Sequence, residues 1–206
     1  MTRTLRSCGA IIALGIMAFA AGCGETEGQP DDSSGTTRTE QQQSDQDSVP
    51  AGVVEQYSSA AEEIAAEGGE TTSGPWRVAY IVEPAEPWYE PADGQQQFRE
   101  PAPDETHHIE ILPFEASTGR IVPQVPITLE VLDPNGRVVD TAPLNFYYST
   151  FFHYANNFSV PDPGRYTLRA TLGTPTFFRH GEADQEPELT QGATVEFTDV
   201  ELTPEN

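Results

Sequence analysis

The residues best suited to hold a metal are a histidine and a glutamate two positions apart, His108 and Glu110. The apolar pattern around them predicts a strand, on which side chains two positions apart project from the same face. Ile109 and Ile111 then face the core, so His108 and Glu110 lie on the outer face, within reach of a ligand or a partner subunit. Imidazole and carboxylate suit first-row divalent metals. Taken alone, such a pair is more often a solvated strand face than a metal site.

The chain has four histidines, and the other three indicate less by themselves. His107 falls on the Ile109 side of the same strand or begins that strand. His153 lies within an aromatic run at 151–154, and His180 follows another at 177–178. Packing is the commoner explanation for histidines beside aromatic runs, so none of the three predicts a site without further information.

The sequence lacks the motifs of common enzyme classes, such as a serine elbow, a phosphate loop or a dinucleotide fingerprint. Its two cysteines, Cys8 and Cys23, lie in the N-terminal segment and are no candidates for catalytic nucleophiles. The formal net charge of -23 repels phosphates, so we expect no nucleic acid partner. We therefore predict a protein that is not an enzyme and whose acidity serves cation binding or life at high salt.

Residues 1–22 are interpreted as a lipoprotein signal peptide. Arg3 and Arg6 form a short basic region, and the apolar stretch that follows is too short and too interrupted by glycine to span a membrane. Positions 20–23 read Ala-Ala-Gly-Cys, which resembles the lipobox of bacterial lipoproteins. The resemblance implies that Cys23 carries a lipid that anchors the protein in the cell envelope, facing the periplasm or the exterior. A plain secretory signal is the alternative.

Residues 23–73 are expected to form an acidic linker. The part at 24–50 lacks large apolar side chains, so nothing offsets the entropy of ordering it, and we expect a disordered tether. Apolar residues recur at helical spacing over 52–67, which predicts a short helix that Gly68 and Gly69 would end. The sequence assigns this helix no function, and the segment fits a spacer equally well.

Residues 74–203 are expected to form an all-β domain, an immunoglobulin-like antiparallel β-sandwich. Asp133 begins an Asp-Pro-Asn-Gly hairpin turn, and the spacing of Asp162 and Tyr166 is typical of a tyrosine corner. The polar, proline-rich stretch at 83–103 is expected to be an extended loop. Alternating apolar residues between such breaks predict seven strands, at 76–82, 107–114, 127–132, 138–144, 151–158, 166–172 and 194–202.

Three segments, in order along residues 76–202, resemble the periplasmic high-affinity ferrous iron transport protein family, a metal-binding lipoprotein antigen type. The strand that holds His108 and Glu110 is similar to its His-hydrophobic-Glu motif. The segment at 152–157 is similar to its His-Tyr-Gly-Ala-Asn motif, and the segment at 175–181 to its Pro-x-x-x-Arg-His-Asp motif. Members of the family are dimeric immunoglobulin-like proteins encoded beside an iron permease.

The resemblance implies a metal site near a subunit interface, with His108, Glu110, His153 and His180 as ligands. The family's methionine ligand, seven residues before the His-Tyr histidine, is Phe146 here. Without the soft sulfur, the set suits copper(II), iron(II), manganese(II) or zinc(II), and we expect copper(I) to bind less tightly.

Two functions follow from these observations. The first is an envelope-anchored, homodimeric, metal-binding lipoprotein that supports high-affinity iron uptake with an iron permease of the membrane. The second is a surface or scaffold β-sandwich that binds no metal, because a fold does not determine a function.

Overall fold

The structure, a computed structural model, describes residues 49–204. The predicted signal peptide at 1–22, the predicted lipidation site Cys23 and the linker up to residue 48 lie outside the described residues. The described chain begins with one helix and continues in strands, which are α2 (Ala51–Glu67), β1 (Gly68–Ser73), β2 (Trp76–Pro84), β3 (Trp88–Ala92), β4 (Gln95–Arg99), β5 (His107–Glu115), β6 (Ile127–Leu132), β7 (Val138–Pro143), β8 (Asn145–Tyr148), β9 (Phe152–Phe158), β10 (Gly164–Leu172) and β11 (Ala193–Leu202).

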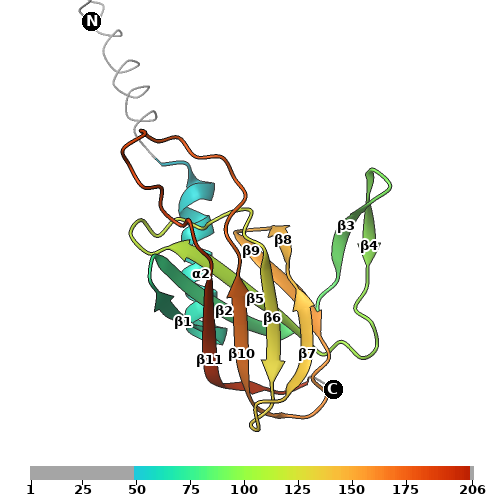
Figure 1. The fold of residues 1–206 in the computed structure, drawn as a ribbon. Coiled ribbons are helices and arrows are strands. Elements are labelled where there is room, and N and C mark those ends of the chain that lie inside the picture. Colours follow the sequence, from blue (N-terminus) through green and yellow to red (C-terminus); the bar gives the residue numbers. More distant parts are fainter. Residues whose placement is uncertain (1–48, 205–206) are drawn as a thin grey trace, which may run out of the picture. The chain divides into compact units, whose positions relative to one another are not determined.

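The strands form two antiparallel sheets that pack against each other (Figure 1). The strand order is β1-β2-β5-β9-β8 in the five-stranded sheet and β11-β10-β6-β7 in the four-stranded sheet. Strands β3 and β4 form a separate hairpin. The predicted all-β antiparallel sandwich is confirmed, and the seven expected strands lie at nearly the expected positions.

The core between the two sheets follows from the alternation of apolar residues. On β6, Ile127, Leu129 and Val131 are buried, whereas Thr128 is exposed. Ile109 of β5 enters the same core from the opposite sheet. Because successive side chains of a strand point to opposite faces, this packing leaves the even-numbered residues of β5 on the outer face of the five-stranded sheet.

Two local predictions are confirmed at the end of the sandwich. Asp133 accepts a hydrogen bond on Oδ1 from the backbone N–H of Arg137 at 2.9 Å, and Gly136 takes a φ of 78°, which glycine adopts without steric cost. The hydroxyl of Tyr166 donates to the carbonyl oxygen of Asp162 at 2.7 Å, which is the hydrogen bond of a tyrosine corner.

The stretch at 83–103 differs from the extended loop that we expected, because it contains the β3–β4 hairpin. Asp93 and Gly94 form its turn, with φ values of 50° and 76°. An Asp-Gly pair is favoured in two-residue hairpin turns because both central residues take positive φ. Figure 1 shows this hairpin standing beside the two sheets.

Residues 50–73, which we expected to be part of the linker, belong to the folded domain. Helix α2 packs on the outer face of the five-stranded sheet, where Ala60 and Ile64 meet Ile81 and Leu112. Strand β1 then pairs with β2 along its whole length. No helix within residues 49–204 is long and apolar enough to cross a membrane.

The end of α2 depends on a glycine. The backbone N–H of Gly68 donates to the carbonyl oxygen of Ile64 and ends the helix, as the sequence predicts. A Cβ at Gly68 would lie 1.9 Å from the carbonyl oxygen of Tyr80, so only glycine allows β1 to pair so closely with β2 directly after the helix.

Candidate metal centre

Two adjacent strands of the five-stranded sheet, β5 and β9, bring their polar residues together on its outer face. His108 of β5 lies opposite Asn157 of β9, and Glu110 lies opposite Ala155. His153 projects from the same face two residues before Ala155. The small side chain of Ala155 leaves room above it, so the imidazole of His153 can approach Glu110.

The structure places His108, Glu110 and His153 in one buried cluster. One potential ligand atom from each lies within 4.8 Å of those of the other two. Nε2 of His153 lies 3.4 Å from Oε1 of Glu110, and Nε2 of His108 lies 4.0 Å from it. A tetrahedral ion with ligands at ~2.0–2.1 Å needs ligand atoms roughly 3.4 Å apart. The cluster therefore fits a first-row divalent ion after small movements of the side chains.

Hydrogen bonds determine which nitrogen of each imidazole faces the cluster. Nδ1 of His153 donates to the carbonyl oxygen of Phe151 at 3.3 Å, because a carbonyl can only accept. Nδ1 of His108 donates to Oδ1 of Asn157 at 2.9 Å. The proton is thus on Nδ1 in both rings, and each Nε2 presents a lone pair toward Glu110. Metal-binding histidines are oriented in this way by outer hydrogen bonds.

Burial keeps the cluster neutral at pH 7 in the absence of a metal. Desolvation, reinforced by the neighbouring His108, lowers the pKa of His153 to about 4. Desolvation also lowers the pKa of His108. Burial raises the pKa of Glu110 to about 8, with further contributions from Glu83, Glu63 and Glu86. The contacts between these groups are therefore not ion pairs, and a bound cation would replace the proton of Glu110.

Glu110 has a buried carboxyl oxygen that no other group contacts by a hydrogen bond in the described part of the chain. The residue is only 4% exposed, and its Oε2 is buried with no hydrogen-bond partner among the described residues. An unpaired buried carboxyl oxygen costs free energy that a metal ion would offset. The lone pair on Nε2 of His108, the lone pair on Nε2 of His153 and the carboxyl group of Glu110 form a donor set that suits a divalent metal ion.

Aromatic side chains wall the cluster on its open side. The ring of Tyr147 stacks on His153 with a centroid distance of 5.2 Å and meets His108 edge-on at 5.7 Å. Trp88 approaches His108 at 6.2 Å. These residues line a cavity of about 940 Å³ that contains the cluster. The predicted outer-face position of His108 and Glu110 is correct, but α2, the segment before β3, and β8 cover the face instead of leaving it open.

His180 does not join the cluster within a single chain. It lies in the irregular segment between β10 and β11, is exposed, and lines a different cavity of about 920 Å³ with Phe178 and Arg120. The physical reason is that this segment leaves the four-stranded sheet, whereas the cluster lies on the far face of the five-stranded sheet. A role for His180 as a ligand stays a prediction that depends on a second copy of the chain.

His107 lies on the inner side of β5, and its Nδ1 is 2.8 Å from the hydroxyl of Thr106. It therefore takes no part in the cluster.

Tyr147 lies beside the cluster although the sequence did not predict it, whereas Phe146, the predicted position of the family's methionine ligand, lies on the other face. Tyr147 of β8 lies directly opposite His153, so both side chains share the outer face. Phe146 lies opposite Tyr154 and packs on it at 4.9 Å, toward the other face. Alternation along β8 would have identified Tyr147, had the pairing of β8 with β9 been known from the sequence.

Placing a thioether beside the histidines is expected to depend on which of these two positions is changed. Tyr147→Met should raise the copper(I) affinity by about tenfold or more, because it adds a soft ligand on the correct face. Phe146→Met should leave the affinity unchanged, because its side chain points away from His153. Competition with a chromogenic copper(I) chelator measures both variants. An increase with Phe146→Met alone would contradict this assignment.

The comparisons with known proteins agree on the fold. No family model matches the sequence, and no curated protein sequence matches it. Solved structures do match. A copper-bound variant of FetP from uropathogenic Escherichia coli strain F11 has a TM-score of 0.53 at 14% identity, covering 68% of this chain and 92% of FetP. The copper-reconstituted P19 protein of Campylobacter jejuni has a TM-score of 0.52 at 18% identity, covering 68% of this chain and 97% of P19. These similarities establish the fold and confirm the sandwich that the family resemblance implied.

Proposed function

We propose that this chain is an envelope-anchored metal-binding lipoprotein that supports high-affinity iron uptake together with a membrane iron permease. The observation that carries the proposal is the convergence of His108, Glu110 and His153 in one buried cluster with an orphaned carboxyl oxygen. Nε2 of each histidine and Oε1 of Glu110 would hold the ion. A bound ion would supply the positive charge that balances the buried carboxylate of Glu110. It would also supply a centre for electron transfer if it is copper or iron.

The donor set favours borderline and hard divalent ions over copper(I). Two imidazoles and a carboxylate suit copper(II) and zinc(II) best by affinity, and iron(II) or manganese(II) where these are more available. The FetP and P19 structures with the same fold contain copper, which supports copper for this chain. We propose copper or iron as the resident metal, with zinc as a competitor.

The iron permease, the homodimer and the lipid anchor at Cys23 are parts of the proposal that the family resemblance supports. The proposed role is the binding of a metal ion, for which the cluster offers two imidazoles and a carboxyl group. The location is the periplasmic or outer side of the membrane.

The direct test is a calorimetric titration of the chelator-treated protein with Cu²⁺ and with Zn²⁺. We expect one ion per chain, with proton release at pH 7 because Glu110 must lose its proton. Iron uptake by cells that lack the protein should fall and should return with the wild-type gene but not with a His153→Ala gene. Absence of stoichiometric binding of either ion would refute the metal site, and normal iron uptake without the protein would refute the transport role.

A further inference from the structure

Asn157 holds the imidazole of His108 through a side-chain amide whose hydrogen-bonding groups are all used. Its Oδ1 accepts from Nδ1 of His108 at 2.9 Å and from the backbone N–H of Glu86 at 3.2 Å. Its Nδ2 donates to the carbonyl oxygen of Glu86 at 2.9 Å and to Oε2 of Glu105 at 3.2 Å. A side-chain amide offers two donors and two acceptor lone pairs. This amide is therefore fully satisfied, and turning it over would break all four hydrogen bonds.

Glu105 helps to fix which way round this amide lies. Burial raises the pKa of Glu105, but its hydrogen bonds, first among them the one from Arg99, outweigh burial and hold that pKa below its usual value. Glu105 is therefore ionised at pH 7, and an ionised carboxylate can only accept hydrogen bonds. The Asn157 amide must then present its NH₂ group to Glu105 and its oxygen to His108. His108 consequently carries its proton on Nδ1 and keeps the lone pair of Nε2 free for a metal ion.

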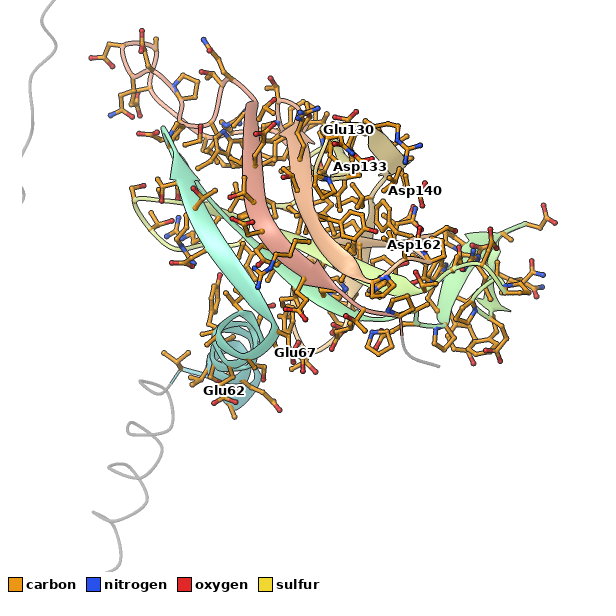
Figure 2. All side chains as sticks on the ribbon, turned by 90° about the horizontal axis from the view of Figure 1, so that it is seen from below. Glu62, Glu67, Glu130, Asp133, Asp140 and Asp162 are labelled. Carbon is orange, nitrogen blue, oxygen red and sulfur yellow. The ribbon has the colours of Figure 1, made fainter. Side chains whose placement is uncertain are left out.

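Glu105 is itself held by Arg99, which belongs to β4. Nη2 of Arg99 donates to Oε1 of Glu105 at 2.5 Å, and the two side chains are 29% and 13% exposed. Other acidic side chains lie on the outside of the sandwich, among them Glu130 (Figure 2). Glu130 pairs with Arg169 at 3.3 Å, with side chains that are 31% and 34% exposed. The pair of Arg99 and Glu105 is more buried than this surface pair, so solvent and salt screen it less.

Arg99 also connects the β3–β4 hairpin to this network. It lies directly opposite Trp88 across the hairpin, and its guanidinium lies over the Trp88 ring, 4.2 Å from the ring centroid. The Trp88 ring in turn lies 6.2 Å from the ring of His108 and 5.9 Å from that of Tyr147. In the described part of the chain, β3 and β4 pair with each other and with no other strand. Side-chain contacts, and not sheet pairing, therefore hold the base of the hairpin against the sandwich.

We propose that Arg99 and Glu105 are positioning residues of the metal site. They act through Asn157 to orient His108, and they thereby couple the β3–β4 hairpin to the site. The proposal rests on the proposed function, because it takes Nε2 of His108 as a ligand of the ion. Coupling of this kind is reciprocal, so a hairpin that supports metal binding is itself stabilised in its docked position when the metal binds.

The first experiment is a double-mutant cycle on the Zn²⁺ affinity, measured by competition with a metal-sensitive dye. Glu105→Ala should weaken Zn²⁺ binding by about tenfold, the lower end of the range for outer hydrogen-bond partners. The same substitution in an Asn157→Ala protein should weaken it by less than about twofold, because the route to His108 is already broken. A general effect of Glu105 on charge or stability would be equal in both backgrounds. The matched variant Glu100→Ala removes an exposed carboxylate next to Arg99 and should leave the affinity nearly unchanged.

A second measurement does not depend on whether Glu105→Ala folds. Hydrogen exchange of the backbone amides at 88–99 is compared in the wild-type protein with and without Zn²⁺. Reciprocal coupling predicts that bound Zn²⁺ slows exchange in this hairpin by about tenfold, the same factor by which the network strengthens Zn²⁺ binding. In Arg99→Met, which removes the guanidinium and keeps an apolar side chain over Trp88, Zn²⁺ should not slow this exchange.

Three results would overturn the positioning role. They are an unchanged Zn²⁺ affinity in Glu105→Ala, an equal loss of affinity in the wild-type and Asn157→Ala backgrounds, and hairpin exchange in the wild-type protein that Zn²⁺ does not slow. Failure of the wild-type protein to bind Zn²⁺ or Cu²⁺ at all would instead refute the proposed function, so the two failures are distinguishable.

Discussion

Replacing His153 by alanine is expected to lower the affinity for Cu²⁺ and Zn²⁺ by at least about 100-fold, or roughly 2.7 kcal/mol. The substitution removes one of two imidazoles in the cluster and leaves Glu110 with a single nitrogen neighbour at 4.0 Å. A side chain that only packs in the core would have no such effect on metal binding. Calorimetry or competition with a metal-sensitive dye measures the change.

Two other variants test the same site, one expected to weaken metal binding and one expected to leave it unchanged. Asn157→Ala removes the acceptor that orients His108 at 2.9 Å, and loss of such an outer hydrogen bond lowers metal affinity by about 10–100-fold. His180→Ala should not change binding by a single chain, because His180 lies in a different cavity. If His180→Ala weakens binding only at protein concentrations where dimers form, a second copy supplies that ligand. Unchanged metal affinity in His153→Ala would disprove the site.

Replacing Glu110 by glutamine is expected to change how the stability of the metal-free protein depends on pH. The pKa of Glu110 is raised from 4.5 to about 8 in the folded state, chiefly by burial. The folded state therefore holds a proton that the unfolded state releases, and this stabilisation is complete below pH 4.5 and is lost as the pH rises to 8. Glutamine has no proton to lose.

The best window for this measurement lies between pH 6.5 and 8. The pKa of His153 is lowered from 6.5 to about 4, so its contribution is complete above pH 6.5 and is lost as the pH falls toward 4. Above pH 6.5 only Glu110 contributes from this cluster, and wild type should lose on the order of 2 kcal/mol relative to Glu110→Gln by pH 8.

Urea denaturation in the presence of a chelator, at several pH values, measures the free energy of unfolding of both proteins. Glu83, whose pKa is raised to about 7 by partial burial and nearby glutamates, affects both proteins alike and largely cancels in the difference. A Glu83→Gln protein should accordingly keep the decline between pH 7 and 8. Parallel curves for wild type and Glu110→Gln would show that the folded state does not protonate Glu110.

Much of the fold was predictable because its causes are local. Alternation along β6 and β10 determines which residues enter the core. The hairpin turn at Asp133 and the tyrosine corner at Tyr166 are predictable because each depends on residues only a few positions apart. The β3–β4 hairpin was missed even though Asp93-Gly94 is a local turn signal, since the flanking glutamines and prolines hide any alternation.

Strand β1 was missed for a different reason. Its sequence, Gly-Gly-Glu-Thr-Thr-Ser, has no apolar pattern, and it is a strand because the free edge of β2 pairs with its backbone. Helix α2 was expected as a helix, but its sequence does not reveal that Ala60 and Ile64 cover the face that holds His108, Glu110 and His153.

The sequence by itself determined that His108 and Glu110 share one strand face, because that follows from a period of two along a single strand. It also predicted the sandwich and the likeness to a metal-binding family, whereas the export signal at 1–22 stays a prediction. Only the tertiary structure decided that β9 lies beside β5, that His153 reaches Glu110 while His180 does not, and that Tyr147 and α2 close over them. The contacts between β5 and β9 join residues more than 40 positions apart, and their geometry comes from sheet pairing and packing, which no local pattern encodes.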